Sequence, residues 1–443
     1  MKTKIVLLAA LFTSLAGFSQ KQWTLKECVD HALKNNITIK QNKLTASLAE
    51  KDVAIAKGNF LPNLNASTGG NLNAGTNFDN VTNTRTPSTT FFGGNLSLNS
   101  GVTVFNGFRN LNSYKQAKLG VESSKLDIEF IENDISLRVV NTYLNILFAK
   151  ENLNVAKTQY EISKKQIERA RAQFDAGSIP KGDLLNVEST AANDAQSVVG
   201  QENTLNLALL NLAQLLQISP NDFDVTSIDV NSPSAALLYN DANDVYLRAL
   251  GIRPEIKKAE LNIENADLGI KLAKGAYLPS VSASLFANSN YRYIIKPSGI
   301  SSGDLFSQLD GNLGYGFGFN VNIPIFNRLQ TKNRVAKSIL NKEQSEFALE
   351  NQKLQLQQTI QQSFLDAKAA VRTYEAAEIS LEAQKEAFKN AQVSYDYGSM
   401  TQFDFDQVRN RLVNAEGAMI RAKYDYVFKT KVLKFYFGES IVD

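Results

Sequence analysis

The sequence predicts an α+β membrane protein: a trimeric, 12-stranded outer-membrane β-barrel with four strands from each chain, continued by a long α-helical coiled-coil periplasmic tube. Three observations predict this fold class. Four segments alternate between apolar and small polar residues, two long stretches are rich in helix formers, and the whole pattern occurs twice along the chain. The chain is therefore expected to consist of two internal repeats.

The chain begins with a stretch that has the composition of a secretory signal peptide. Lys2 and Lys4 precede an apolar run over residues 5–15, and the small residues Gly17 and Ser19 follow at a spacing typical of a cleavage site. We therefore expect residues 1–19 to direct export. No later stretch approaches the ~18 consecutive apolar residues of a membrane-spanning helix, so membrane insertion would have to use strands.

Composition excludes several classes of function. There are 47 Lys and Arg residues, two of them in the signal peptide, against 44 Asp and Glu, so no nucleic-acid footprint is expected. Cys28 is the single cysteine, and we expect it to be a small buried residue of a helix. His31 is the single histidine and has no metal-ligand spacing around it. We therefore predict no enzyme, no catalytic residues, no metal site and no cofactor.

The repeats are visible in paired sequence motifs. FDAGSIPKGDLLNVE (174–188) aligns with YDYGSMTQFDFDQVR (395–409), and KGNFLPNLNAS (57–67) aligns with KGAYLPSVSAS (274–284). The predicted domains are the signal peptide 1–19, a first repeat 20–218, a connector 219–240 rich in Pro, Ser and Asp, and a second repeat 241–443.

Each repeat is predicted to contain a helix, a β-hairpin and a pair of long helices around a turn. The first helices are expected over about 24–57 and 241–274, the hairpins over 60–105 and 277–326, and the turns over 175–182 and 396–403. From about Ala117 to Phe174 there is no proline and one glycine, so this helix could reach roughly 85 Å.

The alternating segments predict membrane strands. In LGYGFGFNVNIPIF (313–326), every odd position is apolar, and the even positions are Gly, Asn or Pro until Phe326. Each segment has at least the ~9–11 residues that a tilted membrane strand needs. The polar faces carry Asn, Ser, Thr and Gly with almost no charge, which suits a water-filled lumen. A half-buried soluble sheet is the alternative, although its outer face should carry Lys and Glu.

Strand number predicts the oligomer. A bilayer does not tolerate an open sheet edge, because unpaired backbone groups there cost several kcal/mol each. Four strands cannot close a solute-conducting barrel, whereas three chains would supply twelve strands. The polar stretches 75–92 and 294–310 are then expected as loops on the far side of the membrane.

Four groups of motifs occur in order, and three of them occur twice. They are TLKECVDHALKNN near the start, Leu-Pro pairs at 61–62 and 278–279, the strand ends VFNGFR and IFNRLQ, and the two Gly-Ser turns. Together they resemble the TolC-like family of outer-membrane efflux and secretion channels, over essentially the whole mature chain. The resemblance implies a homotrimer in the bacterial outer membrane, with its helical domain in the periplasm.

The resemblance also implies partners and a passive function. Substrates would pass from a periplasmic adaptor (membrane fusion) protein, and from an inner-membrane efflux pump or ABC exporter, through the channel to the exterior. Outer-membrane lipid would surround the barrel, and no nucleic acid would bind. Small-molecule efflux and type I protein secretion remain open. The alternative is a trimeric structural or adhesive coiled-coil protein, although such a protein does not need hairpins that interrupt its helices twice.

Site residues implied by the resemblance lie at the turns between the long helices. The expected adaptor contacts are Gly177, Ser178, Gly398 and Ser399, and the expected periplasmic aperture residues are Asp183, Asp404, Asp406, Gln407, Tyr395 and Met400.

Asp404 matches the first aspartate of the family's constriction ring, and Asp183 is its counterpart in the first repeat. Three copies near a threefold axis would favour cations; the alternative is a solvated charge that the helix dipole stabilises. Met400 replaces the arginine that locks the entrance in some members, and Gln407 replaces the second ring aspartate, with Asp406 beside it. The entrance is therefore expected to be looser or held by other contacts.

Overall fold

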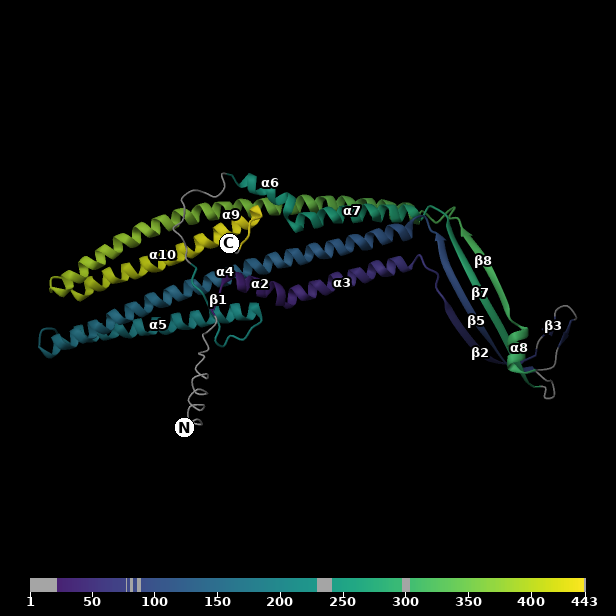
Figure 1. The fold of residues 1–443 in the computed structure, drawn as a ribbon, viewed down its shortest axis with the longest axis horizontal. Coiled ribbons are helices and arrows are strands. Elements are labelled where there is room, and N and C mark those ends of the chain that lie inside the picture. The colour runs from purple at the N-terminus through teal and green to yellow at the C-terminus, as the bar shows by residue number, and fades with distance from the viewer. Residues whose placement is uncertain are drawn as a thin grey trace, which may run out of the picture. The chain divides into compact units, whose positions relative to one another are not determined.

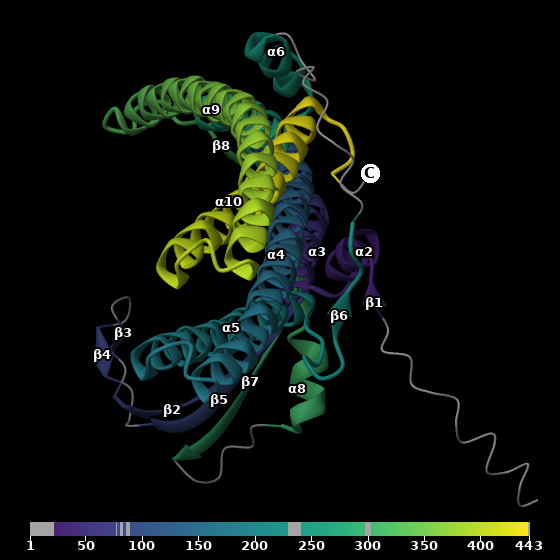
Figure 2. The same cartoon turned by 90° about the vertical axis from the view of Figure 1, so that its left-hand side faces the viewer.

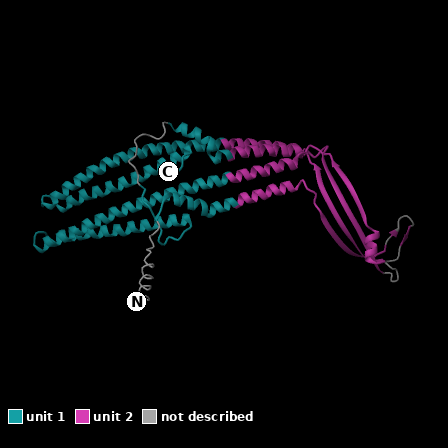
Figure 3. Ribbon diagram, viewed as in Figure 1, with its two compact units in different colours: residues 1–43, 126–257, 350–443 teal, residues 44–125, 258–349 magenta. Residues whose placement is uncertain are grey.

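The computed structural model describes residues 22–76, 78–79, 83–85, 89–228, 241–296 and 303–441. The signal peptide predicted over residues 1–19 lies outside these described residues. The chain divides into two compact units, and each unit takes segments from both sequence repeats (Figure 3). Unit 1 comprises residues 1–43, 126–257 and 350–443, and unit 2 comprises residues 44–125 and 258–349.

Four strands of unit 2 form one antiparallel sheet, in the order β2-β5-β7-β8 (Figure 1). They are β2 (Asn65–Gly75), β5 (Thr89–Phe105), β7 (Ser280–Lys296) and β8 (Gly314–Asn322). Leu98 lies opposite Ala287, and Ala287 lies opposite Tyr315, so the apolar residues of neighbouring strands share one face. This register agrees with the alternation in the sequence.

Two expectations for the loops need correction. Within 75–92, the structure has the short strands β3 (Phe78–Asp79) and β4 (Thr84–Arg85), and β5 already begins at Thr89. Within 294–310, β7 continues to Lys296 and a short helix, α8 (Leu305–Gly311), follows. This helix forms because the Asp304 side chain accepts hydrogen bonds from the first free backbone N–H groups, of Phe306 and Ser307.

The long helices have equal lengths in the two repeats. Helices α4 (Arg109–Asp175) and α9 (Gln330–Asp396) have 67 residues each, and α5 (Lys181–Leu216) and α10 (Gln402–Phe437) have 36 each. Helix α4 begins eight residues before the expected Ala117, because the Asn106 side chain accepts from Asn110 N at 3.2 Å and initiates the helix earlier.

The single first helix expected in each repeat is wrong, because both are broken. In the first repeat, α2 (Leu25–Asn35) and α3 (Ile37–Gly58) are separated at Asn36, whose side chain caps α3 by accepting from Thr38 N at 2.9 Å. In the second, α6 (Ala242–Ile252) and α7 (Pro254–Gly275) are separated at Arg253. Proline disfavours a helical backbone in the residue before it.

The main core of unit 1 is formed by residues of α2, α4, α5 and α10. Helix α2 lies beside two short parallel strands (Figure 2). These are β1 (Gln22–Trp23) and β6 (Asp224–Val225), and β6 lies within the predicted connector 219–240. The Tyr143 side chain is fully buried, and its hydroxyl lies 2.7 Å from the Thr226 carbonyl oxygen. Cys28 is buried in the same core, as expected. Among the described helices, none is long and apolar enough to cross a membrane.

Candidate functional site

The two turns between the long helices have the same backbone geometry. In the first repeat, Gly177 has φ +71°, and Ser178 N donates to the Gln173 carbonyl oxygen at 2.8 Å. In the second, Gly398 has φ +74°, and Ser399 N donates to the Ser394 carbonyl oxygen at 2.9 Å. This bond closes a Schellman motif, whose left-handed position favours glycine. The four predicted adaptor-contact residues therefore occupy equivalent and exposed places in two matching turns.

Asp183 and Asp404 lie in the first turns of the helices that follow. Both side chains are exposed. The Thr401 hydroxyl caps α10 by accepting from Asp404 N at 3.1 Å, and it donates to the Asp404 carboxylate at 2.7 Å. Asp404 is thus both a charge at a helix N-terminus and part of that helix's cap, which supports the helix-dipole interpretation of its position. Gln407, one turn further along α10, is also exposed.

Tyr395, Met400 and Asp406 are half-buried and contact neighbouring side chains instead of projecting freely. The Tyr395 ring stacks on Phe405, with centroids 4.7 Å apart, and Met400 packs on the same cluster. Burial raises the pKa of the Tyr395 hydroxyl, which donates to the Gln402 side chain. Gln402 in turn donates to the Asp406 carboxylate at 3.0 Å. These contacts hold the end of the α9–α10 pair together.

Arg169, near the end of α4, joins the first repeat to the turn of the second. Its guanidinium donates to the main-chain carbonyls of Asp396 at 2.9 Å and Tyr395 at 3.3 Å, and it forms an ion pair with the Asp396 carboxylate. The guanidinium also lies over the Tyr395 ring, 4.9 Å from its centroid. Gln392 donates to both Asp396 carboxylate oxygens at 3.1 Å. We call these contacts of Arg169 with the turn of the second repeat the Arg169 clamp.

Sequence reasoning did not identify Arg169. It sought an entrance arginine at position 400, in the second repeat, where Met400 stands. The aligned position of the second repeat is Asn390, so a comparison of the repeats shows that an arginine is present in one copy only. That asymmetry could have drawn attention to Arg169. Its partner residues could not be predicted, because they depend on how α4 packs against the second repeat.

A second contact between the repeats is buried further along the helices. The Arg409 side chain, 4% exposed, donates to the Ser163 hydroxyl at 2.6 Å and pairs with the Asp194 carboxylate at 3.2 Å. The Ser163 hydroxyl also donates to Asp194. Ser163 and Asp194 belong to α4 and α5, and Arg409 belongs to α10, so this cluster fixes the first helix pair against the second.

A third contact lies further still from the turns. The Glu151 carboxylate of α4 accepts from the Lys423 ammonium and the Tyr424 hydroxyl of α10, at 2.8 Å each. Burial and the hydrogen bond to Glu151 both raise the pKa of Tyr424. The polar contacts between the repeats are therefore distributed along α4, and the Arg169 clamp is the one at the turns.

In the part of the chain that the structure describes, no cluster of three or more His, Cys, Asp or Glu residues is placed to hold a metal ion. His31 packs edge-on against Trp23, with ring centroids 5.1 Å apart, and the two rings meet beside the core of unit 1.

Comparison with known proteins decides the family. The family model described as outer membrane efflux protein matches residues 28–216 and 245–439, which is most of the chain. The chain belongs to this family. This efflux channel protein is 21% identical, over 439 residues, to the outer membrane efflux protein BepC of Brucella suis biovar 1 (strain 1330); the match covers 97% of this chain and 89% of BepC.

Solved structures share the fold of this efflux channel protein. The CmeC outer membrane channel of Campylobacter jejuni matches with a TM-score of 0.74 at 22% identity, over 94% of this chain and 85% of CmeC. VceC, an outer membrane protein of Vibrio cholerae, matches with a TM-score of 0.75 at 16% identity, over 94% of this chain and 96% of VceC. The predicted fold of the chain, its outer-membrane location and its efflux function are confirmed, and the structural or adhesive alternative loses its support.

Proposed function

We propose that three copies of this chain form a passive exit channel, whose periplasmic entrance is built from the turns at 175–182 and 396–403. The main observation that supports this proposal is the sheet of unit 2. One of its faces is lined by Asn, Ser, Thr and Gly, and its outer strands, β2 and β8, have 11 and 9 residues. Strands of similar length can pair between neighbouring chains, because β8 of one chain and β2 of the next would run antiparallel.

Strand arithmetic supports the trimer. Closure of the sheet removes the open edges that a bilayer does not tolerate. Three chains with four strands each give twelve strands, an even number within the range of outer-membrane barrels. The polar faces of the strands then line a lumen wide enough for solutes, and transport through it requires no chemical reaction.

The entrance takes its properties from the turn residues. Exposed Asp183 and Asp404 occupy equivalent first-turn positions, so a trimer would bring six carboxylates to one end of the helical tube. Such a ring lowers the potential in a narrow passage and favours cations. The Arg169 clamp would hold the turn of the second repeat against the first helix pair, and its release would let the α9–α10 pair move.

The partners follow from the location. The exposed Gly-Ser turns, Gly177-Ser178 and Gly398-Ser399, are proposed to contact a periplasmic adaptor protein, which connects the channel to an inner-membrane pump. The matching family and BepC are both outer membrane efflux proteins, so we propose efflux of small molecules in preference to type I protein secretion.

The test combines native mass with conductance. Protein extracted gently from outer membranes should have the mass of a trimer and should form passive pores in planar bilayers. A stable monomer, or a trimer without conductance, would overturn the proposal.

Adaptor contact is tested by crosslinking through an introduced cysteine. The single native cysteine, Cys28, is buried, so a cysteine at position 399 (Ser399→Cys) would carry a bifunctional crosslinker selectively. A cysteine at the exposed Gln407 serves as control, because it lies further along α10. Stronger capture of the adaptor from position 399 is expected, and equal capture from both positions would contradict the assignment of the turn.

A further inference from the structure

Strand β7 extends well beyond its neighbour β8. It has 17 residues against 9, and the pairing of the two strands ends at Asn288 and Gly314. Past that point, side chains of α8 and its C-cap form hydrogen bonds with the backbone groups at the edge of β7. Gln308 Oε1 accepts from Arg292 N at 2.8 Å, and Asn312 Nδ2 donates to the Asn290 carbonyl oxygen at 2.7 Å. Helix α8 therefore covers a stretch of strand edge that would otherwise face the membrane region.

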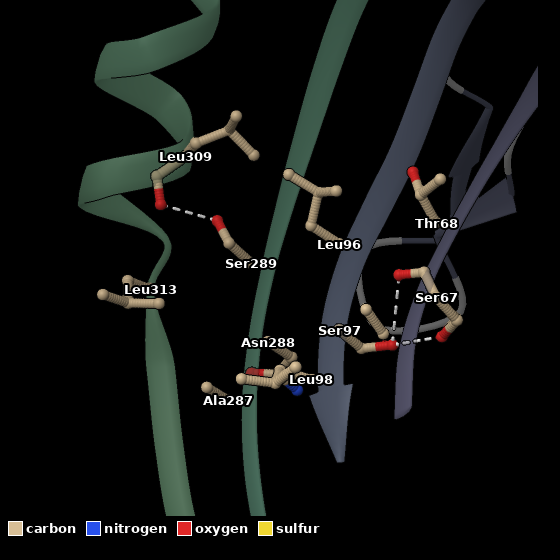
Figure 4. A pocket seen from close by; sticks show the side chains of 11 residues that line it. Ser67, Thr68, Leu96, Ser97, Leu98, Ala287, Asn288, Ser289, Leu309 and Leu313 are labelled. Atoms are coloured by element: carbon tan, nitrogen blue, oxygen red, sulfur yellow. Dashed lines mark hydrogen bonds between the residues drawn. The ribbon is translucent and has the colours of Figure 1, made fainter. Parts of the chain in front are cut away.

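Helix α8 also reaches over the apolar face of the sheet. The Ser289 hydroxyl donates to the Leu309 carbonyl oxygen at 2.6 Å, and Ser289 is only 8% exposed (Figure 4). Ser289 lies opposite Leu96, and two residues before it Ala287 lies opposite Leu98. Residues two apart on a strand share a face, so α8 lies on the leucine-bearing face, opposite the Asn-rich one.

A cavity of about 470 Å³ lies between α8 and this face (Figure 4). Its lining includes Leu96 and Leu98 of β5, Ala287 of β7, and Leu309 and Leu313 from α8 and the residues after it. Thr68 and Ser289 also line the cavity, and the Ser289 hydroxyl already donates to the Leu309 carbonyl oxygen. The volume is within the range of small-molecule sites, and the lining suits a hydrocarbon chain.

Aromatic residues mark the depth of this cavity in the membrane. On the same face, towards the loop end of the strands, Phe92 and Tyr291 lie with ring centroids 6.0 Å apart, and Tyr293 is paired with Phe92. A Cβ on Gly94 would collide with the Tyr291 hydroxyl, so a glycine is needed there to seat the ring. Aromatic girdles flank the apolar band of outer-membrane barrels. The cavity lies on the helix side of this aromatic group, at Leu96 and Leu98, which are four and six residues further along β5.

We propose that this cavity binds an acyl chain of the lipopolysaccharide in the outer leaflet of the outer membrane. The helices of unit 2 join the opposite end of the sheet, which is the periplasmic end in this family. The aromatic group then lies at the outer interface of the membrane, and lipid chains of the outer leaflet reach the cavity below it. The apolar surface continues from the cavity onto α8, where Leu305 and Phe306 are 44% and 76% exposed. In the membrane, this apolar surface is covered by lipid chains, and in the cavity a chain would lie between α8 on one side and the sheet on the other (Figure 4).

The inference rests on the outer-membrane location and not on the entrance. Its test uses the purified protein, extracted in mild detergent from outer membranes that contain lipopolysaccharide, and counts the bound lipids by native mass spectrometry. Ala287→Trp fills the cavity, and Val321→Trp on the same face of β8 is the control, because Val321 does not line the cavity. Wild type and Val321→Trp should retain up to three lipopolysaccharide molecules per trimer, and Ala287→Trp at least tenfold less.

A second variant tests the cavity without a bulky substitution at Ala287, which could prevent folding. Leu313→Asp places a charge at the mouth of the cavity, on a residue that is 56% exposed, and should lower retention similarly. Equal retention by all variants, or retention of only phospholipid or detergent, would overturn the proposal. Trimer mass and conductance are read from the same samples, so a failure of the channel proposal would appear separately from a loss of lipid.

Discussion

The Arg169 clamp should set how readily the proposed entrance opens. The Arg169 and Asp396 side chains are 32% and 49% exposed, so their ion pair alone contributes roughly 0.2–1 kcal/mol. The hydrogen bonds from the Arg169 guanidinium to the carbonyls of Tyr395 and Asp396 add roughly another 0.5–1 kcal/mol, because the donor is charged but partly exposed to water. Loss of the clamp should therefore cost about 1–2 kcal/mol per chain, a factor of about 5–30 in an opening equilibrium.

The perturbation is Arg169→Ala, and the assay is the fraction of time that single channels are open in planar bilayers. The matched control is Arg171→Ala, since Arg171 is two residues away and pairs with Glu188 of its own repeat at 3.0 Å. We expect Arg169→Ala to raise the open fraction strongly and Arg171→Ala to leave it near the wild-type value.

A double-mutant cycle assigns the effect to the contact itself. Asp396→Ala should raise the open fraction by itself, but it should add little in the Arg169→Ala background, because the ion pair is already lost. Equal open fractions for Arg169→Ala and Arg171→Ala, or full additivity of the two substitutions at the clamp, would refute the reasoning.

Three further predictions concern the turns and the core. Asp404→Asn keeps an acceptor for the Thr401 hydroxyl but removes the charge, so cation selectivity measured from reversal potentials should fall; unchanged selectivity would count against the carboxylate ring. Gly398→Ala forces a Cβ into a left-handed residue at φ +74°, which costs roughly 1–2 kcal/mol and should lower the Tm, whereas Gly417→Ala in the middle of α10 should raise it slightly. Burial raises the pKa of the Cys28 thiol to about 12 from an ordinary value of 9.0, so alkylation at pH 8 should require unfolding. The contribution of the buried thiol to the free energy of unfolding should be constant below pH 9 and be lost between pH 9 and about 12. Rapid alkylation of the native protein would contradict this prediction.

The strands could be predicted from the sequence because a period of two residues is a local signal. Alternation along 313–326 placed Tyr315 on the apolar face, and the register with Ala287 agrees. Helix α8 was missed, since its seven residues are too few for a helical period to appear. The break at Asn36 was missed for another reason. An Asn side chain inside a helical pattern can either continue the helix or cap a new one, and packing decides between these two structures.

The site was predictable only where it depends on local turn chemistry. Gly177 and Gly398 identified both turns, because the Schellman motif needs a residue that accepts a positive φ. The Arg169 clamp and the Arg409 cluster join segments more than two hundred residues apart, and no periodicity encodes such pairs. Asp406 was assigned to the aperture by its neighbour in sequence, but its carboxylate accepts from Gln402 within its own helix pair.

The repeats have kept their backbone and changed their side chains where they meet. Both copies retain 67- and 36-residue helices and the same turn, so the scaffold is close to symmetric. The clamp is not symmetric: Arg169 has Asn390 as its counterpart, and Tyr395, which the guanidinium covers, has Phe174. An arginine in each repeat would tie both turns to each other. With one arginine per chain, Arg169 holds the turn of the second repeat. A trimer would have three such clamps, and movement of the α9–α10 pair alone would release each of them.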